Sequence, residues 1–324
     1  MLRVFRTDVY MQAVIIAVVA ALLWARAIVV PTAIPTYSGG SLFYLLFGWM
    51  PPRVATLTAI VIIALEGLLL NGMLYRNKMI NQNTLLPMLF FLLAMSLGTA
   101  QTGLTPLLAA TLFIILCVGQ LMVTGTLLSL SIDKTFGAAA CLSLATLFCP
   151  STVVFLLPVM MCMVNYSLYS WRDWTMLLLG LAAPYIPLEL YYYLSDNMFY
   201  QNYLLFYGLT DIALTVSHSA AGWTMCGIFT LLTLVAMTHT AVGNQSHGTN
   251  YTKNSTAIML FFVGGIAYSL AYGGLVPAAT QAYAVPFAFC TTTLFYDVKE
   301  KEWIWNTLLT LLLLAAAAYN TFIQ

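Results

Sequence analysis

A few ionisable side chains in an otherwise apolar chain could carry chemistry. They are the acids Glu66, Glu189 and Asp211, the arginines Arg26 and Arg53, and His218. An arginine guanidinium can hold a phosphate through two parallel hydrogen bonds, and a carboxylic acid or imidazole can donate or accept a proton. These residue types predict phosphate binding or proton transfer.

Glu66 lies deepest in an apolar segment. It precedes Leu74 by eight positions, hence by about 12 Å along a helix, which is close to the middle of a bilayer. A charge there costs roughly 2.5 to 3.5 kcal/mol on insertion scales, and a short carboxylate does not reach the interface. We expect Glu66 to be either a proton or ligand site in a cavity, or a neutral acid in an interhelical hydrogen bond.

Arg26 and Arg53 bracket a segment that contains Pro31, Pro35, Gly39-Gly40 and an aromatic run from Phe43 to Trp49. The two arginines either clamp the phosphate of a lipid carrier or anchor the chain at the membrane interface. The aromatic run is too short to span a bilayer and predicts a helix lying at the interface.

The second group of candidates follows the prolines Pro184 and Pro187. These prolines loosen the helix before Glu189, so that residue either faces a cavity or lies among headgroups. Asp211 and His218 are seven residues apart, which places them on one face of a helix as a candidate acid and base, although this spacing is common by chance. We assign Glu189, Asp211 and His218 as candidate catalytic residues, and Arg26, Arg53 and Glu66 as candidate binding residues.

No metal, cofactor or nucleic-acid site is predicted. The six cysteines form no Cys-x-x-Cys pair, and the three histidines are far apart in sequence. A phosphate-binding Gly-x-x-x-x-Gly-Lys-Ser/Thr loop is absent, and a net charge of +1 without basic clusters argues against nucleic acid.

Composition predicts the elements that position these residues. Charged residues make up 6% of the 324 residues and hydrophobic ones 62%, and the mean hydropathy is +0.92. Such a chain cannot cover a water-soluble globule and predicts an all-α, polytopic transmembrane helix bundle. Apolar stretches long enough or nearly long enough to span occur at residues 11–30, 54–74, 85–97, 106–130, 174–194, 223–241, 255–272 and 305–322.

Two further segments decide the number of crossings. Residues 136–164 are interrupted at Cys149-Pro150 and predict two short helices, and residues 276–289 predict a thin crossing or a re-entrant segment shielded by protein. If residues 136–164 cross twice and residues 276–289 cross once, all basic residues except Arg26 and Arg53 lie on the cytoplasmic side, where lysine and arginine are enriched. We therefore expect about eleven spans, with the N-terminus on the cytoplasmic side and the C-terminus outside. The first span should stay uncleaved, and short interfacial helices should lie in the outward loops. Residues 1–324 should form one membrane domain.

The segment 136–193 resembles one known family, and two shorter stretches elsewhere in the chain resemble another. Its order of a helix ending at Cys149-Pro150, a helix with Leu157-Pro158, a basic turn at Trp171-Arg172-Asp173-Trp174 and a helix through Gly180-Leu181 resembles the middle of GT-C type glycosyltransferases, which use polyprenyl-linked sugars. Those enzymes usually carry an acidic pair in the first outward loop, and residues 31–53 contain no acid. Phe5-Arg6-Thr7-Asp8 and Arg76-Asn77 resemble an uncharacterised inner-membrane family of the Bacteroidota.

These observations lead to one expected function and two alternatives. The first is a bacterial inner-membrane protein that handles a polyprenyl-linked or phospho-lipid saccharide in an outward-facing cavity, with membrane lipid, such as polyprenyl phosphate, as its partner. The alternatives are a proton-coupled transporter or flippase that uses Glu66, and a non-catalytic subunit of an envelope complex. Whether the chain is an enzyme stays open at this point.

Overall fold

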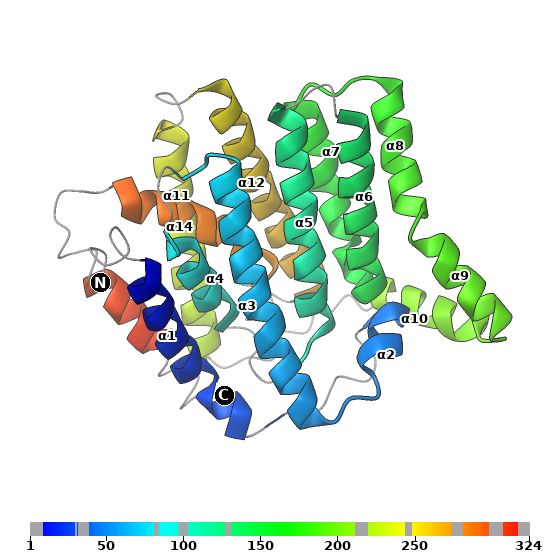
Figure 1. The fold of residues 1–324 in the computed structure, drawn as a ribbon, viewed down its shortest axis with the longest axis horizontal. Helices are drawn as coiled ribbons and strands as arrows, with labels where there is room; N and C mark the ends of the chain where they lie inside the picture. Colours follow the sequence, from blue (N-terminus) through cyan, green and yellow to red (C-terminus); the bar gives the residue numbers. More distant parts are fainter. Residues whose placement is uncertain are drawn as a thin grey trace.

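The computed structural model describes residues 9–29, 31, 39–80, 84–96, 103–126, 131–210, 220–243, 248–273, 281–297 and 307–316. Every regular element in these ranges is helical (Figure 1). The elements are α1 (Val9–Val29), α2 (Ser41–Phe47), α3 (Pro52–Arg76), α4 (Leu86–Ser96), α5 (Pro106–Thr126), α6 (Ser131–Phe148), η4 (Pro150–Phe155), α7 (Leu156–Asn165), α8 (Trp171–Ala182), α9 (Tyr185–Leu194), α10 (Met198–Thr210), α11 (Ala220–Gly243), α12 (Thr249–Tyr268), η6 (Ser269–Gly273), α14 (Ala284–Asp297) and a last apolar helix, Thr307–Ala316.

Four helical stretches are long and apolar enough to cross a membrane, namely Pro52–Arg76, Pro106–Val123, Trp171–Leu194 and Thr249–Tyr272. Their outward faces are apolar too. On α3, for example, Leu57, Val61, Leu65 and Leu68 are all exposed and recur every three or four residues. Such a stripe on one face of a helix suits hydrocarbon rather than water. The fold is thus an all-helical bundle with the helices of a membrane protein.

Local sequence signals explain where several helices begin and end. Pro52 and Pro106 occupy the first positions of α3 and α5, where a missing N–H costs nothing. The predicted break at Cys149-Pro150 is confirmed, because α6 ends at Phe148 and Pro150 begins η4. The predicted stretch 174–194 is divided by Pro184 into α8 and α9, and Figure 1 shows α9 turning away from the bundle.

Two short helices, α4 and α14, form the centre of the bundle. All of α4 is buried, and so is α14 from Ala284 to Phe295. They pack on each other, with the ring centroid of Phe90 at 6.2 Å from that of Phe287 and 5.0 Å from that of Phe295. At 11 and 14 residues they rise about 17 and 21 Å, less than the roughly 30 Å of a hydrocarbon core. The described part of the segment 276–289, residues 281–289, is buried by the surrounding helices, and the choice between a thin crossing and a re-entrant segment stays a prediction.

Three helix ends that carry basic residues lie at one edge of the bundle. Arg76 ends α3, Lys134 lies in the first turn of α6, and Arg172 is the second residue of α8. Figure 1 shows these ends, together with the start of α12, at the upper edge. The start of α12 is tied there by a hydrogen bond of 2.8 Å from Nδ2 of Asn165 to the Lys253 carbonyl.

The opposite edge carries the short helices predicted in the outward segments. The helix expected between Arg26 and Arg53 is α2, in which Phe43 is fully buried. The second outward segment follows α9 and contains α10. The Tyr192 hydroxyl donates to the Ser41 carbonyl over 3.3 Å, which joins α9 to α2. Arg53, near the start of α3, lies at this edge as well.

Candidate functional site

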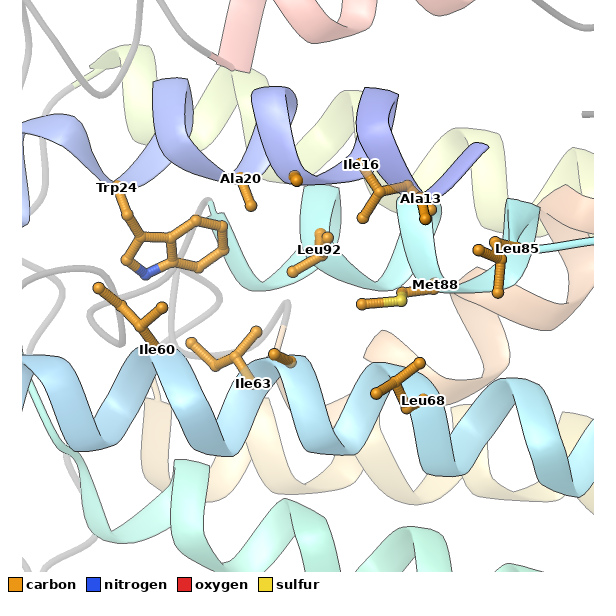
Figure 2. Close-up of a pocket in the computed structure, with 12 residues that line it drawn as sticks. Ala13, Ile16, Ala20, Trp24, Ile60, Ile63, Leu68, Leu85, Met88 and Leu92 are labelled. Atoms are coloured by element: carbon orange, nitrogen blue, oxygen red, sulfur yellow. The ribbon is translucent and has the colours of Figure 1, made fainter. Parts of the chain in front are cut away.

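An apolar pocket lies between α1, α3 and α4 and has a volume of about 250 Å³. Figure 2 shows its lining side chains converging from the three segments. Its lining consists of Ala13, Ile16, Ala17, Ala20 and Trp24 of α1, Ile60, Ile63, Ala64 and Leu68 of α3, and Leu85, Met88 and Leu92 of the α4 segment. The residues of α1 recur every three or four positions and therefore lie on one helix face. We call this space the apolar pocket.

The indole N–H of Trp24 is the one N–H or O–H among the side chains that line the apolar pocket. Trp24 is 3% exposed, and its Nε1 atom has no hydrogen-bond partner among the described residues. An unsatisfied buried donor costs about 1 to 3 kcal/mol. The site can therefore recover that free energy by binding a molecule that carries an acceptor at the Trp24 end.

The two ends of the apolar pocket differ. Figure 2 shows Trp24 and Ile60 at one end and Ala13, Leu85 and Leu68 at the other. The Ala13 end is fastened by a hydrogen bond of 2.7 Å from the backbone N–H of Leu85 to Oε1 of Gln12. Because Gln12 belongs to α1, this bond holds α1 against the start of α4.

The Trp24 end points towards both predicted phosphate ligands. Arg26 follows Trp24 by two residues in α1, although its side chain lies outside the description. Arg53 precedes Ile60 by seven residues in α3, about 10 Å along the helix, and its side chain is exposed. The fold thus places the helix segments of Arg26 and Arg53 beyond the same end of the apolar pocket.

Glu66 is fully buried and does not line the apolar pocket. It faces the side of α3 that packs on α5, where the backbone of Leu112 is its interacting neighbour. Neither carboxyl oxygen forms a hydrogen bond to any described residue. The backbone of Leu112 in α5 is nevertheless close enough to act on the carboxyl group. The two alternatives expected from the sequence, a proton or ligand site and a neutral acid held between helices, therefore both stay predictions for Glu66.

Glu189 is half-buried in α9 and belongs to a polar contact between α9 and α10. Its Oε1 atom accepts a hydrogen bond of 2.8 Å from Nε2 of Gln201, which is fully buried. One turn earlier, the hydroxyl of Tyr185 lies 2.9 Å from that of Thr146, at a small cavity of about 210 Å³. Asp211 and His218 lie outside the described residues, so their placement on one helix face as an acid and a base stays a prediction.

A buried polar cluster that the sequence did not single out joins the start of η4 to the end of α12. The Ser151 hydroxyl lies 3.1 Å from Sγ of Cys149 and 3.2 Å from the Tyr268 hydroxyl. The ring of Phe155 stacks on that of Tyr268 at 6.0 Å. The sequence signal was the Cys149-Pro150-Ser151 break itself, but its partner is more than a hundred residues away. All three polar atoms are paired, so this cluster holds the fold rather than a ligand.

Neither a metal-binding group nor a known relative identifies the site. Within the described ranges, no three His, Cys, Asp or Glu side chains are grouped so as to hold a metal ion. No family model, curated protein or solved structure matches the chain.

Proposed function

We propose that this protein binds a phospho-lipid with a long hydrocarbon chain, such as a polyprenyl-linked saccharide, and presents its headgroup at the edge of Arg53. The observation that carries the proposal is the apolar pocket, whose Trp24 end lies towards Arg26 and Arg53. A pocket of about 250 Å³ takes part of one chain, and each buried CH₂ contributes about 0.8 kcal/mol. The headgroup phosphate is then left to the two arginines, whose guanidinium forks suit it.

The proposal includes the membrane and the orientation. Arg76, Lys134, Arg172 and Lys253 belong to helix ends at one edge, and a basic edge is typical of the cytoplasmic face. The edge of Arg53 then faces outward in a bacterial inner membrane, with about eleven spans, the N-terminus in and the C-terminus out. The proposed topology assigns Glu189, Asp211 and His218 to this outward side, where they would act on the acceptor.

The test is binding of radiolabelled polyprenyl phosphate to the full-length protein in detergent. Ala20 lines the apolar pocket, whereas Val18 on the same helix is exposed and points away from it. We expect Ala20→Phe to lower the affinity at least tenfold because the ring fills the pocket, and Val18→Phe to leave it unchanged. Arg53→Gln should also weaken binding, while Arg172→Gln at the opposite edge should not. Equal binding by the two phenylalanine variants would exclude the proposal.

A second candidate function rests on Glu66. An unpaired acid in the interior of a candidate membrane span is the usual mark of a proton pathway. The two short central helices α4 and α14 are also of the kind that line binding sites in transporters. A proton-coupled transporter or flippase would use Glu66 as its titrating group, and the substitutions that separate this role from a structural one are argued in the Discussion.

A further inference from the structure

A second cavity lies at the basic edge of the bundle, away from the Trp24 end of the apolar pocket. It has a volume of about 450 Å³ and is enclosed by the last turns of α3, the end of α5 and the start of α6. We call it the basic cavity, because Arg76 and Lys134 both line it together with the amide side chains of Asn77 and Gln120. It shares Leu68 with the apolar pocket but extends towards the other end of α3.

The two cations of the basic cavity are not neutralised by the described part of the protein. Neither Arg76 nor Lys134 forms an ion pair with a described carboxylate. The adjacent acid, Asp133, is exposed and does not line the cavity. Lys134 also lies in the first turn of α6, where the helix dipole is positive and adds to its charge. The cavity is therefore a site of uncompensated positive potential.

The rest of the lining is apolar and leaves room for a ligand. It includes Leu69, Met73 and Leu116, so the cavity has one polar side and one apolar side. The room comes in part from Gly72, since a Cβ atom added there would meet no heavy atom within 4 Å. A soluble anion needs no such apolar surface, whereas the glycerol and first methylenes of a lipid do.

We infer that the basic cavity binds the phosphate headgroup of an anionic membrane lipid, with Arg76 and Lys134 as its ligands. Arg76 supplies a guanidinium fork for two phosphate oxygens and Lys134 a second positive charge. The lipid chains continue along the apolar lining and the outward stripe of α3. This site is separate from the phospho-lipid site proposed above, because it lies at the opposite end of α3.

Native mass spectrometry of the full-length protein in detergent tests the inference. The probes are phosphatidylglycerol and phosphatidylethanolamine with identical acyl chains, and inorganic phosphate as a soluble competitor. The protein should retain phosphatidylglycerol preferentially. Arg76→Gln and Lys134→Gln should each lower that affinity about fivefold, since one cation at a headgroup contributes about 1 kcal/mol, and leave phosphatidylethanolamine unchanged. Inorganic phosphate should not compete.

Matched variants separate the site from general surface charge and from misfolding. Arg172→Gln removes a charge at the same edge outside the cavity and should change nothing. Gly72→Leu fills the cavity without touching its charges and should also reduce phosphatidylglycerol binding, whereas Gly227→Leu, at an equally open glycine of α11, should not. The inference is overturned if Arg76→Gln and Lys134→Gln behave like Arg172→Gln, if Gly72→Leu binds as the parent does, or if inorganic phosphate displaces the lipid.

Discussion

Gln201 donates a hydrogen bond of 2.8 Å from Nε2 to Oε1 of Glu189. The donor is fully buried in α10 and the acceptor is half-buried in α9. The carbonyl oxygen of the same amide, Oε1 of Gln201, has no partner among the described residues. Glu189 thus accepts the hydrogen bond that satisfies the NH₂ group of the buried Gln201 amide. Any role of Glu189 on a substrate would come in addition to this contact.

This relationship separates a structural from a catalytic Glu189. Glu189→Ala should lower the free energy of unfolding by about 1 to 3 kcal/mol, because it leaves the Gln201 amide without its acceptor. Glu189→Gln keeps an acceptor oxygen and should unfold close to the parent. Thermal unfolding in detergent measures both, with Asn202→Ala at the exposed neighbour of Gln201 as control. Loss of turnover in Glu189→Gln at parental stability would assign the carboxylate to catalysis, and equal stability of the Ala and Gln variants would contradict the structural role.

Gly40 allows the segment before α2 to approach α6 closely. Its N–H donates to the Phe148 carbonyl over 2.8 Å, and a Cβ atom added at Gly40 would overlap the carbonyl oxygen of Leu147. We expect Gly40→Ala to destabilise the protein by about 1 to 3 kcal/mol, as overpacking does. Gly227→Ala is the matched control. It meets open space within a helix and should stabilise by about 0.5 to 1 kcal/mol. A melting temperature of Gly40→Ala at or above that of Gly227→Ala would show that the close approach is not required.

The sequence predicted the local features of this fold better than its long-range contacts. Apolar length and proline position are local, so the helix ends at Pro52, Pro106 and Pro150 could be expected. The division of residues 174–194 into two helices at Pro184 was not predicted, because a proline can loosen a helix without ending it. Hydrogen-bond partners depend on how distant helices pack. The sequence around Glu66 or Trp24 therefore does not predict that their side chains lack a close hydrogen bond to any described residue.

For the candidate site, too, the sequence predicted single residues but not the cavities around them. The residue type of Arg53 suggested chemistry, but only the packing of α1, α3 and α4 revealed the apolar pocket, whose Trp24 end lies towards the helix segment of Arg53. The basic cavity was missed for the same reason. Arg76 and Lys134 are far apart in sequence, and the charge of each alone predicts only the inner side of the membrane.

The proposed orientation can be checked with exposed positions at the two edges. Asn202 of α10 and Thr249 at the start of α12 are both exposed. In a background without the native cysteines, a membrane-impermeant maleimide applied to intact cells should label Asn202→Cys, and should label Thr249→Cys only after the membrane is opened. The pair carries its own control, since both should react in opened cells. Labelling of both positions from the same side would exclude the eleven-span arrangement.

Glu66 permits a test in which stability and function move in opposite directions. Because neither oxygen is paired, Glu66→Leu removes unsatisfied buried polar groups and should raise the free energy of unfolding by about 1 to 3 kcal/mol. Glu66→Gln stays polar and unpaired and should change it far less. If Glu66 carries a proton, both variants should be abundant but fail to complement a deletion strain, because only the titrating group is lost. Complementation by both, with Leu the more stable, would make Glu66 a tolerated buried acid and remove the transporter as a candidate.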